Sequence, residues 1–431
     1  MMERMKSVIL TLLVVISLVQ SYFLAYSSPK FDKVVQTDYV QNEVIGTKAE
    51  VDDILFPEQV ILHSGTNTHT LLPLSQQFYR MIYDDFLKRK LYDGFHQSDI
   101  SSQNLNWDYI RKTSKGIELR FKKAIPLHVL QQNILQIKQD TTLVDGMVSR
   151  IWIYLVDNSE EVHTYFISDK NSVVFEATKV DISADNVRKY VALGEYLTSY
   201  HSATGDYYLP DESITMARIQ AAFTEFTADQ LKRNLFVDPS MTRYFVERDL
   251  TQTYTDGKRA LQLKSDSHWM NYSDPISTPV DNSNDTKDNL LDSIRFINEH
   301  GGWNGTYIYS QMSSNLDKGP QTFFFRQYVN NYPLIGLTPN NFGYIKLMMQ
   351  RGVVSSYERS LINIDNESIV KKEAILPGGK MLDNLIDSYA KKLQISTVFP
   401  AYQVVVLKGN KVDLIPRWAV ELQDGTNEFI Y

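Results

Sequence analysis

An uncharged stretch near the N-terminus constrains this chain more than any other feature of its sequence. Residues 7–29 contain no Asp, Glu, Lys, Arg or His. Because an α-helix rises about 1.5 Å per residue, a run of this length crosses a bilayer core of about 30 Å. The aromatic side chains of Tyr22, Phe23 and Tyr26 stand where an interfacial belt is expected. The sequence therefore predicts a transmembrane helix over residues 7–29, preceded by a cytoplasmic tail at residues 1–6.

A cleaved signal peptide is the alternative interpretation of the same stretch. Arg4 and Lys6 form a basic region before it, and Ala25-Tyr26-Ser27 has the small-x-small pattern of a cleavage site. The apolar core of a signal peptide is about 7–15 residues long, however, and this run is longer. Its length favours a membrane anchor.

The polar residues of the stretch fall mainly on one side of the expected helix. At about 100° per residue, Ser7, Thr11, Ser17 and Ser21 share an arc of about 120°, and Gln20 lies beside it. Small hydroxyl residues allow close helix packing in lipid, although Ser and Thr also bond back to their own helix carbonyls. The Gln20 amide has donors and an acceptor that seek partners in hydrocarbon. We therefore predict that these five residues contact a partner helix.

The topology is inferred from composition as well as charge. The Lys/Arg bias is nearly balanced, with Arg4 and Lys6 before the span and Lys30 and Lys33 after it. The chain has no cysteine, which suits the outside of a bacterial cell that does not rely on disulfides. We expect a cell-membrane protein with a cytoplasmic N-terminus and an extracellular body.

The composition of the whole chain is that of a folded protein that does not bind nucleic acid. Hydrophobic residues make up 43% and charged residues 22%, with a net charge of −7. Such a profile is far from that of a disordered chain, and the absence of basic runs argues against nucleic acid as a partner.

Periodicity and breakers predict an α+β fold, in which several α+β domains with antiparallel sheets and packed helices follow the transmembrane helix. Three short strands with turns between them form a meander over residues 151–177, and Thr227-Ala-Asp-Gln230 has the spacing of a helix capping box. The predicted parts are a stalk (30–56), an N-terminal extracellular domain (57–148), a middle domain (149–273), a linker (274–287) and two smaller units (288–377 and 378–431).

The last two units are predicted from a short internal sequence repeat, called the echo below. Asp288-Asn-Leu-Leu-Asp-Ser293 recurs as Asp383-Asn-Leu-Ile-Asp-Ser388, each time in an expected amphipathic helix that aromatic-rich strands follow. Chance similarity between two helices is the alternative. The matching order of elements favours a duplication, with each helix packed on an antiparallel sheet.

Motifs of catalysis and of metal or cofactor binding are missing from the sequence. It lacks a Gly-x-Ser-x-Gly elbow, a His-Glu-x-x-His pair, a phosphate-binding loop and a dinucleotide fingerprint. Residues 281–285 begin like a calcium loop, but Thr286 and Asp292 stand where Gly and Glu are needed. The sequence predicts no enzyme, no metal and no cofactor.

Two further sets of residues have plain structural interpretations. His300-Gly301-Gly302 resembles an esterase oxyanion loop, but we expect it to end a helix at residue 300, with Gly301 in the left-handed cap conformation. Four histidines are dispersed in sequence without metal-ligand spacing: His63, His69, His201 and His268.

Five segments, taken in order, form a recognisable pattern. They are Met5–Leu10, Phe296–Trp303, Arg326–Pro333, Tyr357–Leu361 and Pro416–Glu421. With this layout the chain resembles the YycH family, the membrane-anchored extracellular regulators of the WalK/WalR (YycG/YycF) two-component system of low-GC Gram-positive bacteria. The last two segments also resemble the helix-plus-strands pattern of the sister protein YycI and of protease-propeptide-like (PepSY) modules.

The resemblance implies a non-enzymatic regulator. Proteins of this family act with YycI on the WalK (YycG) sensor histidine kinase, which governs cell-wall metabolism, and their membrane helices take part in the contact. The implied partners are therefore a YycI-like protein and the kinase, at the face formed by Ser7, Thr11, Ser17, Gln20 and Ser21. Whether the chain also forms a homodimer is left open.

Two other functions remain as alternatives. One is an extracellular module that binds cell-wall glycan or peptide without contacting a kinase. Its surface would come from aromatic residues that equally well serve packing: Phe323, Phe324, Phe325, Tyr328 and Tyr332. The other is an inhibitor of a secreted hydrolase or protease, of the propeptide kind.

Overall fold

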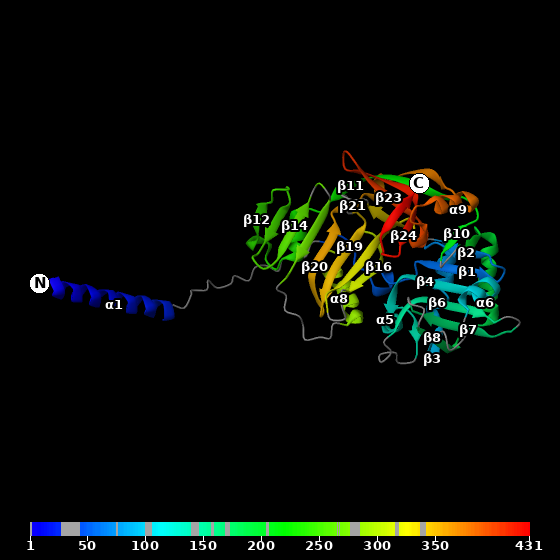
Figure 1. The fold of residues 1–431 in the computed structure, drawn as a ribbon, viewed down its shortest axis with the longest axis horizontal. Helices are drawn as coiled ribbons and strands as arrows, with labels where there is room; N and C mark the ends of the chain where they lie inside the picture. Colours follow the sequence, from blue (N-terminus) through cyan, green and yellow to red (C-terminus); the bar gives the residue numbers. More distant parts are fainter. Residues whose placement is uncertain are drawn as a thin grey trace. The chain divides into compact units, whose positions relative to one another are not determined.

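The chain divides into two units, Met1–Gln41 and Asn42–Tyr431, which are described separately (Figure 1). The computed structural model describes residues 2–431 except 27–43, 75, 100–105, 139–145, 157–158, 169–172, 204–206, 265, 267, 276–284, 315–318 and 337–341. Most of the expected linker therefore lies outside the described residues.

The first unit contains one helix, α1 (Met2–Tyr26). Residues 7–26 of the expected transmembrane helix lie in it, and residues 27–29 are not among those described. Within the described part of the chain, no helix has both the length and the apolar character that a membrane span requires. The predicted transmembrane helix is thus not confirmed.

In the described residues of the second unit, ten strands form a first sheet that is antiparallel except where β3 meets β5. The sheet crosses the expected boundary at residues 148/149, because Leu119 of β4 pairs with Ile151 of β6 and Tyr92 of β3 pairs with Val180 of β8. The predicted meander is confirmed as β6, β7 and β8. The strand order is β10 (Tyr208–Pro210), β9 (Tyr200–Ser202), β2 (His69–Leu72), β1 (Gln59–Ser64), β4 (Lys115–Pro126), β6 (Met147–Leu155), β7 (Val162–Ile167), β8 (Val173–Val180), β3 (Leu91–Asp99), β5 (Gln136–Ile137).

A second sheet, of fifteen strands in the described residues, carries the C-terminal half. Its only parallel pair on these residues joins β18 and β23. The path runs β12 (Arg243–Val246), β13 (Gln252–Thr255), β14 (Ala260–Lys264), β15 (Trp269–Ser273), β20 (Val353–Ser360), β19 (Tyr344–Gln350), β17 (Gln321–Val329), β18 (Tyr332–Gly336), β23 (Ile395–Leu407), β24 (Lys411–Leu422), β11 (Ile214–Glu225), β21 (Ile362–Ile364), with β16 (Thr306–Ser314), β22 (Val370–Leu376) and β25 (Asn427–Ile430) off it.

Short helices accompany both sheets. Their amphipathic patterns place Val187 of α6 and Leu290 of α8 in the main hydrophobic core, whereas Leu382 of α9 lies in a second core. The helices are α2 (Gln77–Tyr83), α4 (Trp107–Thr113), α5 (Leu127–Asn133), α6 (Ala184–Ala192), α7 (Ala228–Leu235), α8 (Thr286–Glu299) and α9 (Gly379–Ser388). Single 3-10 turns are η1 (Val51–Asp53), η2 (Leu87–Arg89), η3 (Leu193–Tyr196), η4 (Pro239–Met241), η6 (Asn366–Ser368) and η7 (Lys392–Gln394).

The expected stalk ends earlier than the sequence predicts. Residues 45–56 belong to the body, where Thr47 forms a β-bridge with Trp303 and where Ile54 and Leu55 are buried. No periodic signal predicted this, because Thr47 and Ala49 bond to residues more than 200 positions away.

The two echo segments both form helices, but the equivalent asparagines in them differ in burial. In α8, Asn289 is fully buried: its Nδ2 donates to Gln321 Oε1 at 3.0 Å, and its Oδ1 accepts from the Gly352 N–H at 2.7 Å. The equivalent Asn384 of α9 is exposed. Whether the two units arose by duplication stays a prediction.

The echo provides a matched pair for a stability test. Asn289→Ala should lower the free energy of unfolding of residues 42–431 by about 1–3 kcal/mol, because it leaves a buried N–H and a buried carbonyl unsatisfied. Asn384→Ala should change it by less than about 0.5 kcal/mol. Urea denaturation monitored by circular dichroism measures both. Equal effects of the two substitutions would contradict the assigned role of Asn289.

Candidate functional site

The predicted partner-contacting residues all lie in α1. Ser17, Gln20 and Ser21 are exposed, and their spacing of three and four residues puts them on one side of the helix. Ser7 and Thr11 belong to the same helix, but their side chains are outside the described part. The described residues thus provide a polar segment of the predicted face.

Large apolar side chains surround this polar segment. Leu10 and Leu18 are each 65% exposed, and Leu12, Val15 and Val19 are about half exposed or more. By helical period, Leu10 and Leu18 fall within the arc of the hydroxyl residues, so the predicted face is partly apolar. The helix as a whole presents an apolar surface interrupted by Ser17, Gln20 and Ser21.

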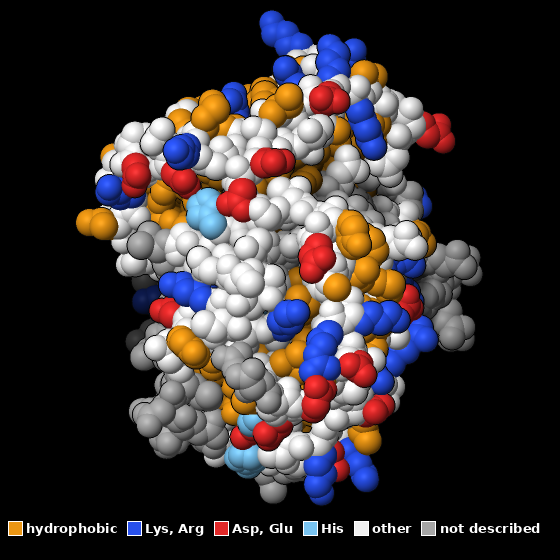
Figure 2. Space-filling view, turned by 90° about the vertical axis from the view of Figure 1, so that its right-hand side faces the viewer, with side chains coloured by type: hydrophobic (Ala, Val, Ile, Leu, Met, Phe, Trp, Pro, Cys, Tyr) orange, Lys and Arg blue, Asp and Glu red, His pale blue; other side chains and the backbone are white. Residues whose placement is uncertain are grey.

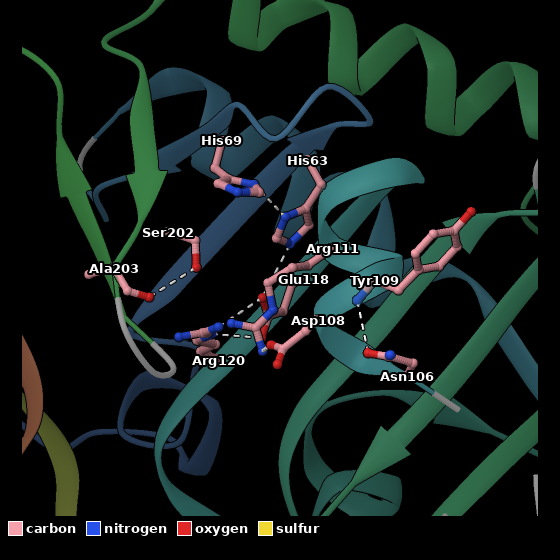
Figure 3. A network of polar contacts seen from close by, with 10 residues as sticks. All are labelled: His63, His69, Asn106, Asp108, Tyr109, Arg111, Glu118, Arg120, Ser202 and Ala203. Atoms are coloured by element: carbon pink, nitrogen blue, oxygen red, sulfur yellow. Dashed lines mark hydrogen bonds and ion pairs between the residues drawn. The ribbon is translucent and has the colours of Figure 1, made fainter. Parts of the chain in front are cut away.

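The body contains a polar network that the sequence did not reveal (Figure 3). The β1–β2 hairpin places His63 opposite His69, with 2.9 Å between their Nδ1 atoms. His63 Nε2 lies 3.2 Å from Glu118 Oε2, and Arg120 donates to both carboxylate oxygens at 2.6 and 3.1 Å. His63 and Glu118 are fully buried.

The hydrogen bonds define which histidine nitrogens carry protons. An ionised Glu118 only accepts, so His63 Nε2–H is the donor to it and His63 Nδ1 is left as an acceptor. His69 Nδ1–H then donates to His63, which leaves His69 Nε2 as an acceptor. This atom is buried and has no hydrogen-bond partner among the described residues. This assignment applies when both imidazoles are neutral, the form that burial favours.

The same burial sets the pKa values of the network. Burial disfavours the charged form of Glu118, but Arg120 and the hydrogen bond with His63 outweigh it and hold the pKa of that carboxyl well below its usual range. Burial lowers the pKa of His63 against the pull of Glu118. Burial, with the charge of His63 as a smaller cause, lowers the pKa of His69 to about 3.

The network is closed in by aromatic rings and has the character of a structural polar core. The His63 ring stacks on Trp152 with centroids 4.8 Å apart, and Tyr208 lies 4.6 Å from His69 and under the Arg120 guanidinium at 5.0 Å. In this cluster no serine, threonine or cysteine is hydrogen-bonded to either histidine. Its charges are balanced by partners within the network.

Of the four histidines named in the sequence analysis, His201 and His268 lie outside this network. His201 Nδ1 pairs with Asp211 at 2.7 Å, and its Nε2 lies 3.4 Å from Asp383. His268 is hydrogen-bonded to Glu225. Over the described residues, no three or more His, Cys, Asp or Glu side chains are arranged to hold a metal ion.

The two sheets of the body are joined by charged contacts. Lys122 of β4 places its Nζ 2.5 Å from Glu421 Oε2 of β24 and 4.6 Å from the Phe399 ring. Tyr328 of β17 donates to Glu58. Burial acts to lower the pKa of Lys122, but Glu58 and Glu421 outweigh it and raise that pKa. The junction is therefore held by one partly buried ion pair and one hydrogen bond to a carboxylate.

The His300-Gly-Gly302 segment ends α8 as the sequence predicts. Gly301 has φ +109° and Gly302 has φ +80°, and the Gly302 N–H bonds to the Ile297 carbonyl at 2.8 Å, which is the long bond of a Schellman cap. His300 stacks on Phe296 with centroids 3.8 Å apart. The segment is a helix cap and no oxyanion loop.

The residue after this cap anchors the start of the body. Trp303 is 2% exposed and exchanges backbone hydrogen bonds with Thr47 at 2.8 and 2.9 Å. Asn298 Oδ1 accepts from the Trp303 indole N–H at 2.9 Å and from the Ala49 N–H, and Asn298 Nδ2 donates to the Ala49 carbonyl. Arg359, itself buried, donates to the Gly302 carbonyl at 3.1 Å.

The surface of the body has hollows that could receive ligands. A cleft of about 410 Å³ is lined by aromatic residues that include Tyr200, Tyr332 and Trp418. A cleft of about 720 Å³ lies over α2, where burial raises the pKa of Asp84. Figure 2 shows Lys and Arg interspersed with Asp and Glu on one face of the molecule, which suits no polyanionic partner there.

The aromatic run of β17 is mainly part of the core. Phe323 and Phe325 are fully buried, because alternate residues of the strand face inwards. Tyr328, which points to the other side of the strand, is 5% exposed. Phe324 and Tyr332 are half-buried. The five residues therefore do not form a shared aromatic surface.

These features define a class of protein: an α+β body whose buried charged groups are matched within the fold, with an apolar N-terminal helix. Two family models match most of the chain between them. "YycH protein, N-terminal domain" matches residues 3–193, and "YycH protein, C-terminal domain" matches residues 204–431. The chain belongs to the YycH family.

Two relatives give the comparison more detail. The Bacillus subtilis (strain 168) "Two-component system WalR/WalK regulatory protein YycH" is 22% identical over 444 residues, which cover 97% of this chain and 94% of that protein. The crystal structure of YycH from Bacillus subtilis matches 90% of this chain and 98% of its own with a TM-score of 0.71 and 17% identity, so the fold is shared. The family is regulatory, and the prediction that this chain is not an enzyme is confirmed.

The histidine network makes a prediction about pH. His69 has a folded pKa of about 3 and an unfolded pKa of about 6.5, so the unfolded chain binds the extra proton between these values. The free energy of unfolding should therefore fall as the pH drops below about 6.5, by up to about 1.4 kcal/mol per pH unit from this group. His69→Asn keeps a donor near the Nδ1 position but does not titrate.

Urea denaturation of residues 42–431 at pH 7.0, 6.0 and 5.0 tests this. The His69→Asn protein should lose stability less steeply than the unsubstituted protein over that range. Parallel pH profiles for the two proteins would show that His69 titrates normally.

Proposed function

We propose that this chain regulates a WalK-type sensor histidine kinase of a two-component system. The observation that carries the proposal is that two YycH family models together account for residues 3–193 and 204–431. The name of the Bacillus subtilis relative adds the WalR/WalK system. The matched charges of the body support a protein that acts by contact with partners, since a catalytic site requires groups that are open to a substrate.

The proposed position is a single pass through the cell membrane, with residues 1–6 in the cytoplasm and the body outside. Its support is the uncharged stretch of residues 7–29, the continuous helix α1 and the exposed apolar side chains along it. The absence of cysteine from a large folded body agrees with an extracellular location that does not use disulfides.

The proposed contact with the kinase is made in the membrane by Ser7, Thr11, Ser17, Gln20 and Ser21. A helix that packs better against one arrangement of the kinase's membrane helices shifts the kinase towards that state. A difference in packing free energy of about 1.4 kcal/mol is enough for a tenfold shift. The body, with a YycI-like protein as its partner, holds the helices in register.

A second candidate is an extracellular module that binds a cell-wall glycan or peptide without contact to a kinase. The aromatic-lined cleft near Tyr200, Tyr332 and Trp418 favours it. Calorimetry of residues 42–431 with peptidoglycan fragments, with kinase output measured in parallel, separates the two candidates. Binding without an effect on kinase output would favour the second candidate.

The helix face is tested by fusing residues 1–30 to an unrelated extracellular domain. The fusion should retain part of the effect on kinase output and should co-purify the YycI-like protein. Gln20→Leu and the double variant Ser17→Ile/Ser21→Ile should weaken both about tenfold, because they remove the side-chain hydrogen bonds and block close packing.

Val15→Ile/Val19→Ile is the matched control, since it adds bulk on the opposite side of α1. This variant should behave like the unsubstituted fusion. If all variants regulate the kinase equally, the proposed face has no part in the contact. If a mature protein without its first thirty residues is found, the membrane anchor is excluded.

A further inference from the structure

Strand β12 is an exposed edge of the second sheet. In the described residues it is the terminal strand of the path, next to β13, and Figure 1 shows it at one end of the body. All four of its residues are exposed, with exposed fractions of 55% for Tyr244, 48% for Phe245 and 50% for Val246. An apolar edge strand is a template for pairing with another strand, and natural proteins usually protect such edges.

The ladder with β13 decides which backbone groups of β12 point outwards. The Glu247 N–H donates to the Thr251 carbonyl at 2.8 Å, and the Glu247 carbonyl accepts from the Leu250 N–H at 3.0 Å, so both backbone groups of Glu247 point across the hairpin towards β13. The backbone groups of an antiparallel strand point alternately to its two sides, so Phe245 and Arg243 also bond towards β13. The N–H and C=O groups of Tyr244 and Val246 therefore point away from the sheet.

A row of side chains across the sheet continues to this edge. Cross-strand partners in the row are Tyr357, Tyr272, Leu261, Tyr254 and Tyr244. The first three are buried, Tyr254 is half-buried under Lys232 of α7, and Tyr244 is exposed although its ring lies 5.0 Å from that of Tyr254. Of these five side chains, Tyr244 at the sheet edge is therefore the one left exposed to solvent.

The outward-pointing groups allow β12 to pair with itself in a specific register. In an antiparallel pair, Tyr244 must bond with a residue whose own groups also point outwards, and Val246 of the partner subunit satisfies this. Phe245 then faces the partner's Phe245 in a non-hydrogen-bonded pair, where side chains approach most closely. The same register places Arg243 opposite the partner's Glu247, so opposite charges meet at both ends.

The charged residues are positioned for this pairing. Arg243 is exposed, and the described residues contain no ion pair for it. Glu247 Oε1 accepts from Thr253 Oγ1 at 2.7 Å and from Gln262 Nε2 at 3.0 Å, which holds the carboxylate on the face of Phe245. Arg243 lies on that face too, because residues two apart on a strand share a face.

We propose that a second copy of this chain docks on β12 by antiparallel edge-to-edge pairing, with Phe245 on the two-fold axis. The pairing satisfies the outward groups of Tyr244 and Val246 and covers the uncovered end of the tyrosine row. It is an isologous interface, in which the same strand serves both subunits. The proposal concerns the body alone and is independent of the kinase contact through α1.

Disulfide crosslinking of the full chain in its membrane tests the register, because the chain has no cysteine of its own. Phe245→Cys should form a disulfide-linked dimer under mild oxidation, since the Cα atoms of a non-hydrogen-bonded pair lie about 4.5 Å apart, within disulfide reach. Tyr244→Cys should stay monomeric, because the register separates the two copies of this position by more than about 7 Å.

Two further arms keep the test specific. Copies with Arg243→Cys should crosslink to copies with Glu247→Cys in a mixture, whereas neither should crosslink alone. Adding Arg243→Glu to Phe245→Cys should reduce the dimer at least about twofold, and Arg243→Lys should not, because only the first places like charges opposite each other. Val237→Cys, 82% exposed and outside β12, measures random collision.

A Phe245→Cys dimer no more abundant than that of Val237→Cys would overturn the proposal. So would a crosslink from position 245 to a different protein in place of the dimer, since that protein would then be the occupant. Neither result would affect the proposed regulation of the kinase, which is measured by kinase output from α1 variants.

Discussion

The buried indole of Trp303 ties together the start of the body, helix α8 and the second sheet. Asn298 holds the indole and the backbone of Ala49, and Arg359 of β20 binds the Gly302 carbonyl beside it. Because Arg359 is 1% exposed, these bonds form in a region of low water content, where an unmatched group would be costly. The position of residues 45–56 in the body depends on this cluster.

Four of the five segments that carry the family resemblance, all except Met5–Leu10, make contacts within the body. Phe296–Trp303 supplies the helix cap and the indole, and Arg359 lies in Tyr357–Leu361. Tyr328 in Arg326–Pro333 reaches Glu58, and Glu421 at the end of Pro416–Glu421 reaches Lys122. These segments are thus structural: they join the two halves of the body, and none of them forms a catalytic group.

A regulator that works through contacts needs a rigid body and surfaces that stay available. The charges of Glu118 and Glu421 are matched by Arg120 and Lys122, since burying a charge is tolerated only with partners in good geometry. The side of α1 that carries Ser17, Gln20 and Ser21 and the edge of β12 are the available surfaces. The two lie in separate units of the chain, so a contact with the kinase and a contact between copies need not compete.

The amino-acid sequence alone determined the features that arise from neighbouring residues. The helix over residues 7–26, the β6–β8 meander, the Thr227–Gln230 capping box and the Gly301 cap all follow from short-range periodicity or from a single turn. The candidate contact face on α1 is of the same kind, since it needs only the period of a helix. Such features can be predicted because their contacts lie within a few positions of each other.

Tertiary structure alone decided the features that join distant residues. It continued one sheet across the expected boundary at 148/149, drew residues 45–56 into the body, and placed His63 and His69 beside Glu118, 55 residues from His63. It also left β12 at an open edge. Burial and strand order depend on which segments meet, and a contact between residues far apart leaves no period in the sequence to predict it.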